Sequence, residues 1–84
     1  MVETNNEKLQ NDIRKIVAKI IEVTPEKIGV DTHFVDELGA DSMMALEIMA
    51  VLEKTYKIDI PEEDLPKLAT LRQAVQLIQK ILSK

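Results

Sequence analysis

Apolar residues recur at the helical period in three segments of this chain, and every glycine and proline falls between those segments. Residues three and four apart lie on the same side of a helix, so the pattern predicts helices that each bury one face. The first helix is predicted to begin near Thr4, which forms a capping-box pattern with Glu7, and to end around Val23. Its apolar face consists of Leu9, Ile13, Ile16, Val17 and Ile20.

A second long helix is predicted from Ser42 to about Tyr56. Its predicted core face holds Ala45, Ile48, Met49, Leu52 and Tyr56. The opposite side carries Met43, Met44, Glu47, Ala50, Val51 and Lys54. This is too much apolar surface for a face in contact only with water. We therefore expect a further element or a partner protein to cover it.

The last helix is predicted to open at Thr70, where a second capping-box pattern pairs this residue with Gln73. Its apolar residues are Leu71, Ala74, Val75, Ile78, Ile81 and Leu82. A short helix is predicted before it, after Pro61, because the acids at 62–64 complement the dipole of a first helical turn. Pro66 prevents that helix from being long and regular.

A long connection from about Ile28 to Asp41 follows a single short turn at Thr24–Glu26. Connections of this length are often functional. We expect four of its apolar residues to pin it to the core, namely Ile28, Val30, Phe34 and Leu38. No strand pattern is longer than the stretch 56–60. The sequence predicts an all-α fold with one domain over residues 1–84: a small four-helix bundle with three longer helices, one short helix and a long loop between helices 1 and 2.

The composition argues against several classes of protein. With 84 residues the chain has room for one small core, and the absence of cysteine excludes disulfides and thiolate metal sites. No apolar run approaches the roughly 20 residues that cross a bilayer, and residues 1–6 show no secretory signal. We therefore expect a cytoplasmic monomer that does not insert into membranes.

The sequence contains few candidates for catalytic residues or metal ligands. The acids lack the order of a calcium-binding loop, so no metal site is expected. The single histidine, His33, lies in the long loop, where a surface role is the ordinary one. A dyad with Ser42 would need the two side chains about 3 Å apart, and no sequence feature brings them together. The chain is therefore expected not to be an enzyme.

Charge is distributed unevenly along the chain, whose net charge is −4. Residues 31–64 contain ten acidic and two basic residues, whereas the flanks contain five acidic and nine basic ones. This balance argues against a nucleic-acid partner, which needs clustered Lys and Arg. An acidic middle region can steer a basic protein partner, although it is also what an ordinary solvated surface shows.

The stretch from Leu38 to Met43 forms a tight turn that delivers an acid and a hydroxyl, Asp41 and Ser42, to the start of the second long helix. A helix N-terminus is electropositive and rich in free N–H groups, so a phosphodiester attached there would be favourably placed. Taken alone, the pair is better explained as a simple N-cap, a role that both residue types fill well, because Asp-Ser before a helix is ordinary.

The sequence resembles the acyl carrier protein family over nearly its whole length. The matching features, in order, are Phe34–Ser42 with its Leu-Gly-Ala-Asp-Ser run, Leu46–Ile48, Ile60–Asp64 and Leu68–Leu71. The resemblance implies that a phosphopantetheinyl transferase attaches 4′-phosphopantetheine from coenzyme A covalently to Ser42, with Asp41 and Gly39 beside it. It also implies that acyl groups are held on this arm as thioesters and presented to enzymes such as acyltransferases and ketosynthases.

Three positions depart from the family pattern. Met43 replaces the usual leucine, which conserves volume, Met44 stands where fatty-acid carriers commonly have an acid, and Lys54 interrupts an acidic helix. Among the fatty-acid, specialised lipid and polyketide pathways that the family serves, these departures argue against a housekeeping fatty-acid role and favour a dedicated pathway, such as specialised lipid or polyketide assembly. Peptidyl or aminoacyl carriers are an alternative, but their usual Gly-Gly turn does not match Ala40.

Enzymes that act on the arm must approach its attachment point, so the docking surface is expected around Ser42. The residues expected to form it are Asp36, Glu37, Met43, Met44, Glu47, Ala50 and Val51, with Glu53 at the margin. A different class of function remains open, an unmodified acidic helical adaptor that docks a basic partner and uses Ser42 only as a cap.

Overall fold

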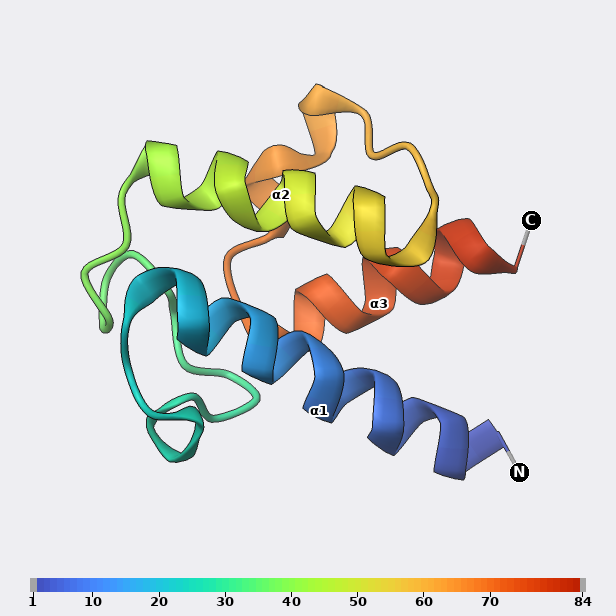
Figure 1. Cartoon of the computed structure of the whole chain (residues 1–84), viewed down its shortest axis with the longest axis horizontal. Coiled ribbons are helices and arrows are strands. Elements are labelled where there is room, and N and C mark those ends of the chain that lie inside the picture. The colour runs from blue at the N-terminus through green and yellow to red at the C-terminus, as the bar shows by residue number, and fades with distance from the viewer. Residues whose placement is uncertain (1, 84) are drawn as a thin grey trace.

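The computed structural model describes residues 2–83, with side chains from Glu7 to Ser83. The chain forms the α-helices α1 (Val2–Ile21), α2 (Ser42–Tyr56) and α3 (Leu71–Leu82) and the short 3-10 helices η1 (Pro25–Lys27) and η2 (Glu62–Lys67). In Figure 1, α2 lies above α1, α3 crosses at an angle, and the loop between η1 and α2 closes one end. The predicted all-α arrangement with a long loop before the second long helix is confirmed.

Helix α1 differs from the prediction at both ends. It begins at Val2 instead of near Thr4, whose side chain lies outside the described part of the chain. It ends at Ile21 instead of Val23 because Glu22 adopts a left-handed conformation with φ of 61°. The N–H of Val23 then donates to the carbonyl of Ala18 at 3.0 Å and closes the last turn.

The core is aliphatic apart from Phe34 and is centred on α1, which packs against both α2 and α3. Its largest fully buried side chains are Phe34, Ile13, Ile28, Ile48, Leu52, Leu71, Ile78 and Val17. Helices α2 and α3 also pack against η2, which lies above α2 in Figure 1. The predicted core faces are largely correct, but Leu77 is buried although its position was not assigned to the core face, and Leu82 is half-exposed.

The long loop is attached to the start of α3 by backbone and side-chain bonds. The N–H of Phe34 donates to the carbonyl of Ala69 at 2.8 Å, and the N–H of Arg72 donates to the carbonyl of Val30 at 2.9 Å. The Arg72 guanidinium also makes a two-pronged contact with the Asp31 carboxylate, at 2.7 and 3.1 Å. Burial of Ile28 and Phe34 confirms two of the predicted anchors, while Val30 and Leu38 are half-buried. The loop therefore holds a fixed path toward α2.

The cap predicted at Thr70 is confirmed, whereas the cap that the Thr24-Pro25-Glu26 pattern predicts at Thr24 is not. The Thr70 hydroxyl accepts a hydrogen bond from the N–H of Gln73 at 3.2 Å and so caps α3. Thr24 precedes η1 without a side-chain cap bond. The predicted short helix after Pro61 is the 3-10 helix η2, which contains Pro66. Its irregular geometry follows from the missing N–H of that proline.

The strand-like stretch 56–60 forms no strand. Lys57 ends α2 in a left-handed conformation with φ of 56°, and its N–H donates to the carbonyl of Glu53. The Glu53 carboxylate then accepts a hydrogen bond from the N–H of Ile60 at 2.8 Å. This side chain thereby fixes the turn between α2 and η2. None of the helices in residues 2–83 is long and apolar enough to cross a membrane.

Candidate functional site

The turn before α2 is built by a glycine, a buried alanine and an acid. Gly39 has φ of 76°, a conformation that glycine adopts without steric cost, and its N–H donates to the carbonyl of Val35 at 3.2 Å. Ala40 is buried, and its N–H donates to the carbonyl of Phe34 at 3.0 Å. Phe34 is itself hydrogen-bonded to Ala69, just before α3 begins. The bond between Ala40 and Phe34 therefore fixes the beginning of α2 relative to the start of α3.

Asp41 is the N-cap of α2. Its backbone is extended, with φ of −112° and ψ of −178°, and its carboxylate accepts a hydrogen bond from the N–H of Met44 at 2.9 Å. The carbonyl of Asp41 accepts the first helical bond, from the N–H of Ala45 at 3.0 Å. The sequence left the cap open between Asp41 and Ser42, and the structure assigns it to Asp41.

Ser42 is the first residue of α2, and its side chain is exposed. Because Asp41 satisfies the N–H of Met44, the Ser42 hydroxyl has no capping role. The N–H groups of the first helical turn that lack intrahelical partners lie at this end, where the helix dipole favours negative charge. An exposed hydroxyl at an electropositive helix end suits the attachment of a phosphodiester.

His33 makes its hydrogen bonds within the loop. Its Nδ1 accepts a hydrogen bond from the N–H of Asp36 at 3.2 Å and lies 3.7 Å from the Asp36 carboxylate. The N–H of His33 donates to the Glu37 carboxylate at 3.0 Å. Among the described side chains, those of residues 7–83, no hydrogen bond joins His33 to Ser42, and no cluster of three or more metal-binding side chains occurs. These bonds instead order the acidic part of the loop.

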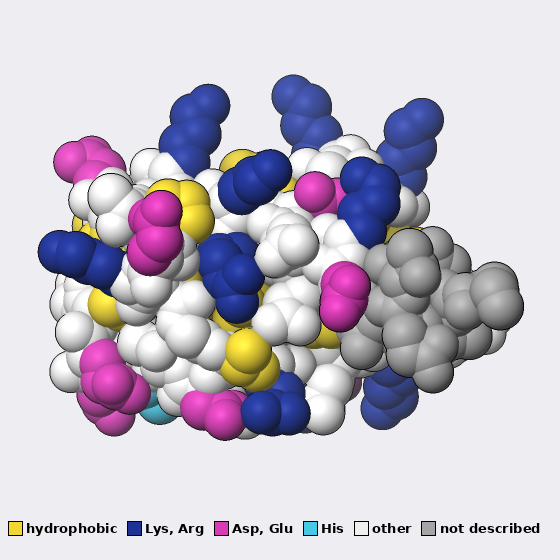
Figure 2. Space-filling view, turned by 90° about the horizontal axis from the view of Figure 1, so that it is seen from below, with side chains coloured by type: hydrophobic (Ala, Val, Ile, Leu, Met, Phe, Trp, Pro, Cys, Tyr) yellow, Lys and Arg dark blue, Asp and Glu magenta, His cyan; other side chains and the backbone are white. Residues whose placement is uncertain are grey.

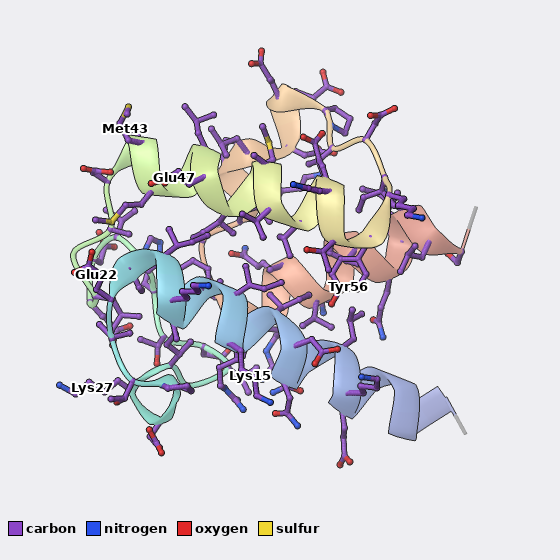
Figure 3. All side chains as sticks on the ribbon, viewed as in Figure 1. Lys15, Glu22, Lys27, Met43, Glu47 and Tyr56 are labelled. Carbon is purple, nitrogen blue, oxygen red and sulfur yellow. The ribbon has the colours of Figure 1, made fainter. Side chains whose placement is uncertain are left out.

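An exposed apolar surface surrounds the start of α2. Met43 is 70% exposed, Val35 49%, Leu46 41% and Val51 37%. In Figure 3, Met43 points away from the body of the molecule at the first turn of α2, and Glu47 lies one turn further along the same helix. Leu46 and Val35 were not among the expected docking residues. The helical angle places Leu46 beside Met43, so the period alone could have found it.

Two of the expected docking residues are placed differently from the prediction. Met44 does not point away from the core but is half-buried and packs against it. The reason is its place in the helix, four residues before the buried Ile48, which puts its side chain at the edge of the core face. Glu53 is half-buried and uses its carboxylate to hold Ile60. Asp36, Glu37, Glu47, Ala50 and Val51 are exposed as expected.

The exposed acids of α2 and its loop contrast with the underside of the molecule. Figure 2 shows that face, seen from below, with Lys and Arg side chains spread over it and acidic side chains scattered between them. Figure 3 places two of these basic residues, Lys15 and Lys27, on α1 and η1, on the side away from Met43. Basic side chains from α1 and η1, in the flanks of the sequence, therefore lie on this side, with acidic ones among them.

Together these features define a small helical attachment domain, with an exposed serine at a helix start and an acidic, partly apolar rim. The family model of the phosphopantetheine attachment site matches residues 11–78. An acyl carrier protein of Wolinella succinogenes is 36% identical over 82% of this chain and 91% of its own length. One of Sulfurovum sp. is 32% identical over 87% of this chain and 97% of its own length.

A third relative, an acyl carrier protein of Buchnera aphidicola subsp. Acyrthosiphon pisum, is 35% identical over 86% of this chain and 90% of its own length. The chain belongs to the acyl carrier protein family. Members of this family are non-catalytic carriers that hold 4′-phosphopantetheine covalently.

Proposed function

We propose that Ser42 is the attachment point of the 4′-phosphopantetheine arm and that the protein presents arm-bound acyl groups to other enzymes. When bound, the arm supplies the thiol that this cysteine-free chain lacks, and acyl groups are held there as thioesters. The observation that supports this assignment is the division of roles at the start of α2. Asp41 caps the helix, which leaves the exposed hydroxyl of Ser42 available for modification.

The residues around Ser42 fit such a group. A phosphodiester on the Ser42 hydroxyl lies next to the unpaired N–H groups at the start of α2, which stabilise negative charge. Gly39 acts through the backbone, because only its left-handed conformation is needed for the turn. A Cβ at this position would meet no protein atom within 4 Å, so the backbone angle and not packing of the protein explains the glycine. Asp41 contributes by holding the first turn in place.

The docking surface for partner enzymes combines charge with apolar contact. Asp36, Glu37, Asp41 and Glu47 steer a basic patch on the partner, and Met43, Leu46 and Val51 supply the contacts that persist at high salt. The partners are a phosphopantetheinyl transferase, which takes the arm from coenzyme A, and enzymes such as acyltransferases and ketosynthases. The pathways that use such a carrier are fatty-acid, specialised lipid and polyketide synthesis.

The experiment is an intact-mass measurement after incubation with coenzyme A, magnesium and a broad-specificity phosphopantetheinyl transferase. We expect the wild type to gain one phosphopantetheine group and Ser42→Ala to gain none. Ser83→Ala is the matched control, because Ser83 is the other serine of the chain, and it should load like the wild type. An unchanged wild-type mass, or loading of Ser42→Ala, overturns the assignment. The first of these results favours the unmodified adaptor.

A further inference from the structure

Met43 is the most exposed large apolar side chain of residues 7–83, at 70%. It immediately follows Ser42 and points outward from the first turn of α2 in Figure 3. Methionine differs from the other apolar residues because a mild oxidant converts its thioether to a polar sulfoxide, and enzymes reverse the change. This position is therefore one where a reversible modification would alter the polarity of the surface beside the attachment point.

The other described methionines are protected to different degrees. Met44 is half-buried and packs against the core, and Met49 is only 8% exposed. Oxidant must reach the sulfur, so accessibility ranks Met43 first, Met44 second and Met49 last. Because Met43 makes no part of the buried core, its oxidation leaves the packing of α1, α2 and α3 intact. Oxidation of Met49 would instead place a polar group in the core.

We propose that Met43 is a redox-sensitive modification site whose oxidation by a hydroperoxide weakens partner docking. A lone pair of the Met43 sulfur attacks one peroxide oxygen, a sulfur–oxygen bond forms and the oxygen–oxygen bond breaks. The departing oxygen takes up a proton and leaves as water or an alcohol. The sulfur loses two electrons and the peroxide gains them. A thiol-dependent methionine sulfoxide reductase restores the thioether.

The consequence for docking, which rests on the proposed function, follows from desolvation. The thioether enters an interface at little cost, whereas a sulfoxide oxygen must give up water or find a donor in the partner. The charges of Asp36, Glu37 and Glu47 are unchanged by this step, so the electrostatic steering of the partner is unchanged too. Oxidation should therefore lower affinity without altering how binding depends on salt.

The first part of the experiment tests site preference. The wild-type protein is treated with hydrogen peroxide, and the oxidation rate of each methionine is followed by peptide mass spectrometry. We expect Met43 to be oxidised at least about tenfold faster than Met49, in line with the difference in exposure. Oxidation of Met49 as fast as Met43, with the fold retained by circular dichroism, overturns the proposal.

The second part tests the consequence for docking. Loading by the phosphopantetheinyl transferase is measured for the wild type and for Met43→Leu, each compared with its own untreated sample. Oxidation should lower kcat/KM of the wild type by roughly tenfold, the scale of one apolar contact made polar, and sulfoxide reductase should restore it. Met43→Leu should keep its own untreated value after the same treatment.

The outcomes separate this proposal from the proposed function. If untreated wild type does not load at all, the proposed function fails, and the docking consequence fails with it. If untreated wild type loads normally and the oxidised protein loads equally well, the redox proposal alone is overturned. An equal loss in oxidised Met43→Leu overturns it as well, because the loss then comes from another residue.

Discussion

Asp41 and Ser42 are neighbours, but their replacement by alanine should have different effects. Asp41→Ala should lower the stability of the fold, whereas Ser42→Ala should prevent loading. The Asp41 carboxylate accepts the N–H of Met44 at 2.9 Å and caps α2. Loss of such a cap costs about 1 kcal/mol, within a range of about 0.5–2 kcal/mol. For a domain of this size, that lowers the melting temperature by roughly 4–8 °C per kcal/mol. Ser42 is exposed and caps nothing, so Ser42→Ala should change stability by less than about 0.5 kcal/mol.

The assay is urea and thermal unfolding followed by circular dichroism, together with the loading reaction. We expect Asp41→Ala to be the less stable variant and Ser42→Ala to be the variant that cannot be loaded. Asp41→Asn is the matched control, because asparagine caps about as well as aspartate, and it should lose only the few tenths of a kcal/mol due to the charge at the helix start. Destabilisation of Ser42→Ala by more than that of Asp41→Ala would refute the assignment of the cap.

Three further predictions concern other parts of the fold. The Tyr56 hydroxyl is buried without a hydrogen-bond partner within the described residues, and burial, followed by the charge of Asp12, raises its pKa. Tyr56→Phe should therefore be neutral or stabilising by up to about 1 kcal/mol in urea unfolding, and a loss above that would show a missed partner. The Arg72 hydrogen bond lowers the pKa of Asp31 below its ordinary 3.8. The Asp31–Arg72 pair therefore contributes to the free energy of unfolding above about pH 4, and this contribution is lost as the pH falls through the lowered pKa of Asp31. The difference in the free energy of unfolding between wild type and Asp31→Asn should accordingly shrink in acid. A difference that does not change with pH would show that titration of Asp31 does not affect stability. Amides of residues 60–69 should exchange faster than those of α2, because η2 is short and contains Pro66, and equal protection would argue against local opening there.

Sequence patterns were sufficient for the elements whose signals are local. The helical period with glycine and proline at its boundaries located α2 at Ser42–Tyr56, and the capping pattern at Thr70 located the start of α3. The end of α1 was less well predicted because Glu22 adopts a left-handed conformation there, and glutamate is not a residue type from which such a conformation is predicted. The 3-10 form of η2 was not specified by the sequence prediction, although Pro66, which lacks a backbone N–H, was expected to prevent a long regular helix there.

The position of the candidate site was predicted correctly, but the roles of its individual residues were not. The acid and the hydroxyl before α2 were recognised, yet the choice of Asp41 as cap depends on backbone angles that residue identity does not fix. Met44 was assigned to the outer face, but it lies four residues before the buried Ile48 and so at the edge of the core face, where it packs against the core. Glu53 was misplaced because its carboxylate bonds to Ile60, seven residues away and beyond the end of the helix.

The loop contacts explain why this start of α2 would tolerate the modification that we propose at Ser42. Bonds from Phe34 to Ala69 and from Arg72 to Val30 and Asp31 tie the loop to the start of α3, at 2.7–3.1 Å. The bond from Ala40 to Phe34 extends this connection to the residue before the cap. The start of α2 is thus positioned by main-chain bonds and by Asp41, none of which requires the Ser42 hydroxyl. A group attached there can change without loss of the contacts that hold the helix, and this independence is what a carrier needs when its cargo is exchanged repeatedly.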